Sequence, residues 1–311
     1  MESKLQLSVQ TGDWYDELFN GDEGAEEAFR FIKECGFDTL DYNIDHQLSI
    51  RKLKEGEKPD YFDLSDEEFT ARFAPVKEAM EKYGISMGQA HAPFPLYIEG
   101  RDDLNDFLIK VVAKQCALCQ FLGCPALVVH PYTYLEDKER EKEINLEMYR
   151  KMIPIGKKYG VTLCLENMFA WSNGHATLGV CGEAAEACWY IDTLNAEAGE
   201  DIFGYCFDVG HANLSSRNIR QELRTLGHRL TILHIHENDG LSDAHQMPYT
   251  CKPGTDWEGF IQGLKDINYQ GALSFETFAG LKGGIPHELF GAKLKYLHEV
   301  GVYFRNRIME A

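Results

Sequence analysis

Seven polar side chains of this 311-residue chain follow short apolar runs, at positions where buried strands would end. They are His91 in AHAPF, His130 in VVHPY, Glu166 in LENM, Asp208 and His211 in FDVGHAN, His236 in HIHEND, and Glu276 in SFET. A general acid/base site needs two or three such groups, whereas this many imidazoles and carboxylates form the ligand set of a divalent metal. Any one of these histidines alone is more often a hydrogen-bonded core residue, but that interpretation fits the seven together poorly. The pattern therefore predicts a metal site.

The spacing of Asp208 and His211 would let a strand-end carboxylate and the imidazole of the following turn reach one point, as a bound metal requires. His234 has the same parity as His236 but lies one layer deeper, so we expect a buried, hydrogen-bonded residue that supports a ligand rather than being one. The other histidines match no strand end and are expected in loops or on helix surfaces: His46, His175, His228, His287 and His298.

Eight short apolar or β-branched runs recur along the chain and predict strands. They cover residues 5–9, 37–42, 85–91, 126–130, 161–166, 203–208, 230–236 and 272–276. Helical patterns lie between them, with capping boxes expected at Ser65 with Glu68 and at Thr255 with Glu258. Glycines stand where the helices before the next strand should end: Gly36, Gly84, Gly123 and Gly160.

Eight such units without a linker predict an α/β protein, a single (β/α)8 TIM barrel over residues 1–311, rather than two doubly wound domains. In a closed barrel, alternate strand residues face the axis and the helices. Large residues such as Leu127, Leu163 and Phe207 alternate with small ones such as Ala126 and Cys164. We therefore expect the large residues to face the helices. The small ones should lead inward to the polar residue at the carboxyl end of each strand, where barrel enzymes place their chemistry.

Composition and charge narrow the classes of partner. With 44% hydrophobic and 26% charged residues, the chain is typical of a globular protein. A formal net charge of −19 repels phosphate backbones and anionic membranes, so neither a nucleic acid nor a membrane is an expected partner. No run resembles a signal peptide or a membrane span, which predicts a cytoplasmic protein. The nine cysteines are expected to be reduced, with the CxxC pair Cys116 and Cys119 packed in a core.

The order of the motifs carries a family resemblance. HAPF, HPY, LEN, DVGHAN, HIHENDG, DAH and SFET on eight βα units resemble the xylose-isomerase-like TIM-barrel superfamily of sugar-phosphate isomerases, epimerases and endonuclease IV. Each motif alone is weak, but the ordered set covers nearly the whole chain. Resemblance to the ketose 3-epimerases implies a metal held by Glu166, Asp208, His236 and Glu276, with His211 beside it and close to the substrate.

Endonuclease IV has a three-zinc site, and this chain is similar at all nine of its ligand positions. The additional positions are His91, His130, Asp243 and His245, the last two in SDAH. These residues are therefore candidates for further metal ligands or for substrate contacts. The net charge of −19 argues against a nuclease. The basic segment 51–58 also contains acidic residues, and we expect it to form a solvated lid rather than a phosphate clamp.

The first functional hypothesis is a metal-dependent sugar or sugar-phosphate isomerase or epimerase that moves a proton next to a carbonyl. Glu166 and Glu276, from the fifth and eighth strands, would act as catalytic acid and base from different sides of a metal-bound substrate. Mixed nitrogen and oxygen ligands favour Mn or Zn over Mg. Aromatic residues of the predicted βα loops could stack on a sugar or fill space beneath the loops: Trp14, Phe94, Tyr132, Phe169 and Trp171.

Two other functions stay open. An endonuclease IV-like zinc phosphodiesterase would use several metals, so the number of metal ions per chain discriminates it from an isomerase. A non-catalytic sugar-binding barrel is the third hypothesis. Ketose epimerases of this superfamily carry an arginine after the HxH motif, whereas this chain reads HENDGLSDAH there. The sugar, its phosphorylation, the choice among isomerisation, epimerisation and dehydration, and a homo-oligomeric state are therefore left open.

Overall fold

Eight parallel strands form the central sheet of the computed structural model, which describes residues 5–44, 47–281 and 286–310. The strands are β1 (Leu7–Gln10), β2 (Thr39–Asn43), β3 (Ser86–His91), β4 (Ala126–Val129), β5 (Thr162–Glu166), β8 (Phe203–Asp208), β9 (Leu230–His234) and β10 (Leu273–Phe275). Their order is β10-β1-β2-β3-β4-β5-β8-β9, and a parallel bridge between Ile235 and Phe275 joins the two edges. The sheet is therefore closed, and the predicted (β/α)8 barrel is confirmed.

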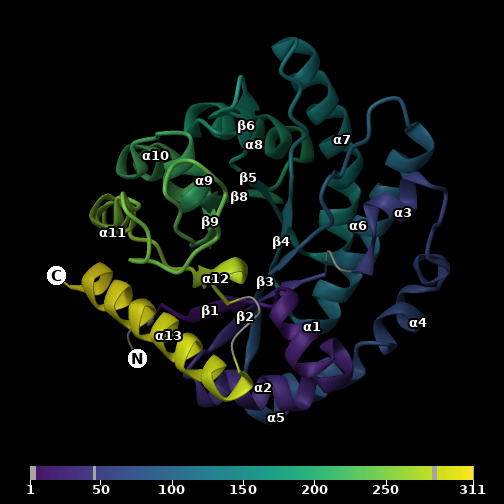
Figure 1. The fold of residues 1–311 in the computed structure, drawn as a ribbon. Helices are drawn as coiled ribbons and strands as arrows, with labels where there is room; N and C mark the ends of the chain where they lie inside the picture. The colour runs from purple at the N-terminus through teal and green to yellow at the C-terminus, as the bar shows by residue number, and fades with distance from the viewer. Residues whose placement is uncertain (1–4, 45–46, 282–285, 311) are drawn as a thin grey trace.

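Helices surround the strands, as Figure 1 shows. They are α1 (Asp13–Phe19), α2 (Ala25–Glu34), α3 (Ile50–Lys54), α4 (Asp66–Ala71), α5 (Ala74–Tyr83), α6 (Asp102–Leu122), α7 (Lys138–Tyr159), α8 (Ala184–Ala198), α9 (Val209–Leu214), α10 (Ile219–Leu226), α11 (Trp257–Asp266), α12 (Phe278–Leu281) and α13 (His287–Met309). In the part of the chain that the structure describes, none of them is long and apolar enough to cross a membrane.

Local sequence signals set most of the helix ends. Gly84, Gly123 and Gly160 end α5, α6 and α7 with φ of 61°, 71° and 64°, a left-handed conformation that glycine adopts without a Cβ clash. The predicted capping box of Ser65 and Glu68 opens α4. The box predicted at Thr255 and Glu258 is wrong, because α11 begins one residue later and the side chain of Asp256 accepts the hydrogen bond from Gly259 N instead.

The predicted alternation of strand residues separates two cores. Inside the barrel, one cluster contains Ala126, Val128, Cys164, Cys206 and Ile232. The large residues of opposite parity, among them Leu127, Leu163 and Phe207, belong to the core between the sheet and the helices. Small inward side chains leave room on the axis, so the polar residues at the strand ends can lie close together.

A short antiparallel hairpin was not predicted. Its strands are β6 (Phe169–Ser172) and β7 (His175–Leu178), and it follows β5 at the carboxyl end of the barrel. The turn is Asn173-Gly174, with φ of 51° and 78°. Asn-Gly between alternating residues is a strong hairpin signal, so this hairpin could have been predicted from the sequence.

All nine cysteines are free, and seven of them are buried. Cys116 and Cys119 lie in α6 with 0% and 1% of their surfaces exposed, as expected for core residues. Burial raises the pKa of the Cys116 thiol, which keeps it protonated and unreactive.

Candidate active site

The polar strand-end residues gather at one end of the barrel. Glu166 and Asp208 are the last residues of β5 and β8, His91 is the last residue of β3, and His130 and Glu276 directly follow β4 and β10. Each of these side chains is buried, with at most 8% of the residue exposed. The carboxyl ends of parallel strands meet at one rim, which explains why residues so far apart in sequence become neighbours.

Three carboxylates and one imidazole form the deepest group. The Nδ1 of His234 lies 2.6 Å from Glu166 Oε1, 3.3 Å from Glu276 Oε2 and 3.9 Å from Asp208 Oδ2. One ligand atom from each of the four residues lies within 4.8 Å of the others. His234 is buried and hydrogen-bonded as predicted, but its Nδ1 faces the three carboxylates at the place that the sequence assigned to His236.

A second group lies beside the first and contains the other predicted ligands. His211, His236, Asp243 and His245 also bring their ligand atoms within 4.8 Å of one another. His236 Nε2 is 3.0 Å from Asp208 Oδ1, and its ring stacks on His245 with centroids 3.8 Å apart. Asp208 therefore stands between the two groups, with His234 on one side and His236 on the other.

Two anchors position this second group. Asn167 bonds both backbone groups of Asp208, each at 2.7 Å, and its own carbonyl lies 2.8 Å from His211 Nδ1. The buried carboxylate of Glu237 accepts hydrogen bonds from the backbone N–H groups of Thr250, Cys251 and Thr255 and from the indole of Trp257. These bonds hold the loop after β9, which carries Asp243 and His245, against the barrel.

His91 and His130 form a third group with Glu166. His130 Nε2 lies 2.8 Å from Glu166 Oε2, while His91 Nε2 lies 4.0 Å from Glu276 Oε1. Burial, followed by the neighbouring His130, lowers the pKa of His91 well below its ordinary value. This imidazole is therefore neutral at physiological pH, which is the state that can offer a lone pair.

The carboxylates of Glu166, Asp208 and Glu276 have no lysine or arginine partner in the described part of the chain. Among the described residues, only histidines lie within ion-pair distance of them. Burial raises the pKa of Glu276 to about 7. Burial also acts to raise the pKa of Glu166, but His234 and His130 outweigh it and hold that pKa well below its ordinary value. The two glutamates thus differ in proton affinity although they share one site.

A cavity of about 430 Å³, the mouth cavity, opens above these groups. Its lining residues are His91, Phe94, His130, Glu166, Met168, Phe169, Trp171, His211, Asp243, His245, Glu276 and Phe278. Phe94, Phe169 and Trp171 therefore line the cavity in which the sequence hypothesis expects aromatic rings to stack on a sugar. Trp14 does not, because it is 1% exposed within α1 and donates its indole N–H to Gln10 O. Tyr132 packs against Tyr97 and lies outside the lining.

Sequence reasoning missed a polar layer beneath the carboxylates. Gln10 Nε2 donates to Glu276 Oε1 at 2.6 Å, and Asp41 lies 3.2 Å from His234 Nε2. Gln89 Nε2 donates to Asp41 Oδ2 at 2.9 Å. All three residues lie near the carboxyl ends of β1, β2 and β3 and are at most 2% exposed. The parity that located the strand-end ligands would also have located these residues.

Three of the remaining histidines lie away from the site. His175 and His228 are exposed and His298 packs on Phe37, whereas His46 falls outside the described residues. His287 is the first residue of α13. In the basic segment 51–58, Arg51 pairs with Glu55 and Lys52 with Glu57, and the segment contributes no residue to the mouth cavity.

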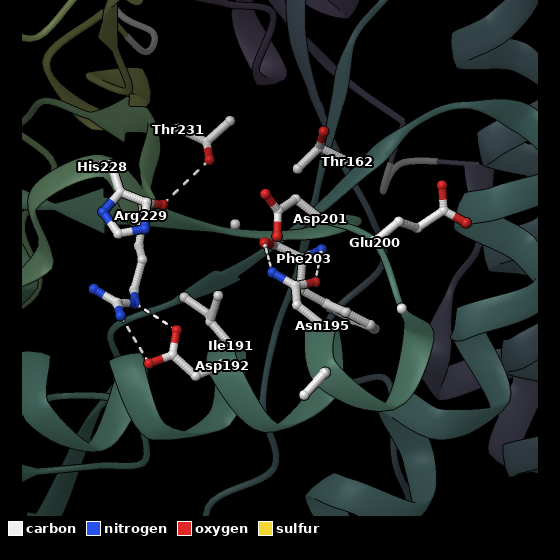
Figure 2. A pocket seen from close by; sticks show the side chains of 13 residues that line it. Thr162, Ile191, Asp192, Asn195, Glu200, Asp201, Phe203, His228, Arg229 and Thr231 are labelled. Atoms are coloured by element: carbon white, nitrogen blue, oxygen red, sulfur yellow. Dashed lines mark hydrogen bonds and ion pairs between the residues drawn. The ribbon is translucent and has the colours of Figure 1, made fainter.

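A second cavity, the basal cavity, lies at the opposite end of β5, β8 and β9 and has a volume of about 660 Å³ (Figure 2). Two of its charged groups are paired with each other: Arg229 donates to both oxygens of Asp192, at 2.6 and 2.7 Å. Asn195 is hydrogen-bonded to the backbone at Ile202 and Phe203. The site predicted from the sequence therefore coincides with the smaller of these two cavities.

A family model and several known proteins match this chain. The family model described as xylose isomerase-like TIM barrel matches residues 29–300. An uncharacterized protein from Sinorhizobium fredii is 22% identical over 299 residues, covering 89% of this chain and 88% of the relative. A D-psicose 3-epimerase from Enterocloster bolteae is 27% identical over 158 residues, covering 51% of this chain and 47% of that enzyme.

Solved structures share the fold. The 3-keto-D-glucoside 4-epimerase from E. coli superposes with a TM-score of 0.67 at 17% identity, covering 95% of this chain and all (100%) of that one. A D-psicose 3-epimerase from Clostridium cellulolyticum H10 gives a TM-score of 0.69 at 17% identity, covering 97% of this chain and 99% of that one. The family model spans most of the sequence, so the chain belongs to the xylose isomerase-like TIM-barrel family.

Proposed function

We propose that this protein is a metal-dependent sugar isomerase or epimerase that transfers a proton next to a carbonyl. The observation that carries the proposal is the group of three buried carboxylates and one imidazole with no lysine or arginine paired to it in the described part of the chain. Buried carboxylates in this number are costly unless a cation compensates them or some of them take up a proton. The family's D-psicose 3-epimerase from Enterocloster bolteae supports the choice of reaction class.

The donor set fits a divalent transition metal. Glu166, Asp208 and Glu276 offer oxygens and His234 a nitrogen, a mixture that favours Mn or Zn over Mg. We assign His234 to this site in place of His236, because His234 faces the carboxylates. When bound, the metal would polarise the substrate carbonyl and hold the neighbouring hydroxyl.

Glu166 and Glu276 are the proposed proton-transfer groups. They come from β5 and β10, which are not adjacent in the barrel, so they reach a sugar carbon from different sides. His130 holds one oxygen of Glu166 and Gln10 holds one oxygen of Glu276. The other oxygen of each carboxylate faces His234 at the center of the site. Acids and bases that are positioned in this way accelerate proton transfer about 10²- to 10⁴-fold.

The mouth cavity favours an uncharged sugar. Its lining contains carboxylates and aromatic rings but no lysine or arginine among the described residues. A phosphate group there would meet Asp243 and Glu276 without a compensating cation, whereas Phe94, Trp171 and Phe278 can stack on the apolar face of a sugar ring. We therefore expect an unphosphorylated substrate.

The test is deuterium incorporation from D2O into a panel of ketoses and aldoses, each with its phosphate ester, together with elemental analysis of the purified protein. We expect about one Mn or Zn per chain and exchange at the carbon next to the carbonyl of an unphosphorylated sugar. Metal-loaded protein that exchanges deuterium with none of these sugars would contradict the isomerase proposal.

A second candidate is a metal-dependent phosphodiesterase. The observation that favours it is the presence of two further groups with metal-ligand geometry, His211–His236–Asp243–His245 and His91–His130–Glu166. Three metals per chain with cleavage of abasic duplex DNA would support this candidate. The net charge of −19 and the acidic lining of the mouth cavity favour the isomerase, and we expect no DNA binding at ~150 mM salt.

A further inference from the structure

Asp41 is a buried carboxylate that the proposed reaction does not use. It lies on β2, one layer below the strand-end groups, and is 0% exposed. Its Oδ2 lies 3.2 Å from His234 Nε2 and accepts a hydrogen bond from Gln89 Nε2 at 2.9 Å. Among the described residues, its Oδ1 has no hydrogen-bond partner.

This carboxylate is costly to keep in the barrel. A buried charge needs a partner, and in the described part of the chain the imidazole of His234 is the charge-bearing group within ion-pair distance of Asp41. Gln89, which also donates to Leu233 O at 3.2 Å, fixes the carboxylate in place. The arrangement places Asp41 Oδ2 within 3.2 Å of His234 Nε2, a buried nitrogen that makes no hydrogen bond among the described residues.

His234 stands between Asp41 below and the proposed metal ligands above. Its Nδ1 lies 2.6 Å from Glu166 Oε1 and 3.3 Å from Glu276 Oε2, while its Nε2 faces Asp41. In this structure Nδ1 is hydrogen-bonded to Glu166 Oε1, and Nε2 has no hydrogen bond among the described residues. A metal among the carboxylates needs the Nδ1 lone pair, so the proton of the neutral ring must then lie on Nε2, where the nearby carboxylate of Asp41 can accept it. Without Asp41, the tautomer with its proton on Nδ1 would place a hydrogen in the space among the carboxylates.

We propose that Asp41 is a positioning residue that fixes the tautomer and ring orientation of His234 and thereby strengthens binding of the catalytic divalent metal. The inference rests on the proposed function, because it assumes a metal among Glu166, Asp208, His234 and Glu276. Asp41 itself does not touch the substrate or the metal; it acts through His234.

The test is metal affinity. Purified wild type and Asp41→Asn would be stripped of metal, then titrated with Zn²⁺ and Co²⁺ against a chromophoric chelator. Asparagine keeps the shape but replaces the charged acceptor with a neutral one. We expect affinity to fall by roughly 10- to 100-fold, the usual effect of losing the carboxylate behind a metal-binding histidine. The visible spectrum of bound Co²⁺ should change as well, which a purely structural defect in a folded protein would not cause.

The matched control is Thr39→Val. Thr39 lies on the same strand with the same inward parity, is 0% exposed, and donates to Ser86 O at 2.9 Å. This variant loses a hydrogen bond in the same strand, and Thr39 is not hydrogen-bonded to His234. We expect its metal affinity to stay within about 2-fold of wild type, although its stability falls.

A double-mutant cycle separates positioning from general damage. In a His234→Gln background, Asp41→Asn should have little further effect on affinity, because the residue through which it acts is gone. If Asp41→Asn does not fold, Gln89→Leu replaces it, since that change loosens Asp41 without neutralising it. We expect a loss of roughly 3-fold for Gln89→Leu.

Unchanged affinity and Co²⁺ spectrum in a folded Asp41→Asn protein, with wild type binding stoichiometrically, would overturn the role of Asp41 alone. Equal losses from Asp41→Asn in the wild-type and His234→Gln backgrounds would overturn it too. A wild type that binds no metal under these conditions would instead overturn the proposed function and this inference with it.

Discussion

The two cavities at opposite ends of the barrel differ in how their charges are satisfied. The basal cavity is larger, about 660 Å³ against about 430 Å³, but its Asp192 is bonded through both oxygens to Arg229. In the mouth cavity, Glu166 and Glu276 face histidines and other carboxylates within the described residues. The proposed site is therefore distinguished by its buried carboxylates, which have no lysine or arginine partner among the described residues, rather than by its cavity size.

The difference follows from strand direction. The carboxyl ends of parallel strands carry the βα loops and can gather polar side chains from all eight strands, whereas the amino ends carry turns that stabilise the barrel. Charges at the basal cavity can pair locally because they lie near the surface, where a salt bridge is inexpensive and weak. Charges at the mouth cavity are buried, so they depend on one another and on what binds there.

The largest expected effect is on catalysis at the mouth cavity. Glu276→Gln should reduce deuterium exchange by about 10²- to 10⁴-fold, because the amide keeps one oxygen and the same volume but neither accepts nor gives a proton at neutral pH. The measurement is deuterium incorporation by NMR, with metal content determined separately. If the fully metal-loaded variant exchanges as fast as wild type, Glu276 is a ligand only and the proton passes through Glu166.

Metal removal is the second prediction. A site held at ~100 times its Kd in free metal stabilises the fold by about 2.7 kcal/mol, so a chelator should lower the Tm of this protein by about 4 °C. Differential scanning calorimetry with and without chelator measures the shift. Asp192→Asn, a change in the basal cavity, should show the same shift. A Tm that does not respond to the chelator would count against a buried metal site.

The third prediction concerns pH in the metal-free protein. Burial raises the pKa of Glu276 to about 7, from about 4.3 in an unfolded chain, so the folded state holds this proton more tightly. Wild type should therefore lose stability relative to Glu276→Gln as pH rises from about 4 to about 7, by about 3 kcal/mol. Urea unfolding of both proteins across this range tests it. A relative stability that is flat or increases with pH would contradict it.

The smallest change in stability is expected at the basal cavity. There the stabilising contribution is lost as pH falls, whereas at Glu276 it is lost as pH rises. The hydrogen bond from Arg229, outweighing a small burial effect, lowers the pKa of Asp192. The pair thus stabilises the fold above pH ~4, and this contribution disappears as pH falls below that value. Asp192→Asn should cost about 0.2–1 kcal/mol at neutral pH and leave deuterium exchange unchanged. A large loss of exchange in this variant would remove the functional distinction between the cavities.

The fold could be predicted from the sequence because the signals for strands and helix ends are local. Residues such as Leu163 and Cys164 alternate along β5, and glycines such as Gly160 end the preceding helix, so both strand parity and element boundaries could be predicted without tertiary information. The hairpin at Asn173-Gly174 was equally local and was simply missed. For Trp14 the structure decided between the two predicted roles in favour of core packing, because an aromatic residue near a strand end fits a sugar-binding loop or a core equally well.

The sequence by itself determined which residues reach the carboxyl rim, because the residue types along each strand indicate its parity and its end. Only the tertiary structure decided which of those residues belong to the group around His234 and which to the group around His236. His234 and His236 share one parity and lie two positions apart, yet the first faces Glu166 and Glu276 while the second faces Asp208 and Asp243. Asp41 lies beneath the first ring, and the loop after β9 lies beside the second. These contacts join distant parts of the chain, and no local pattern encodes such contacts.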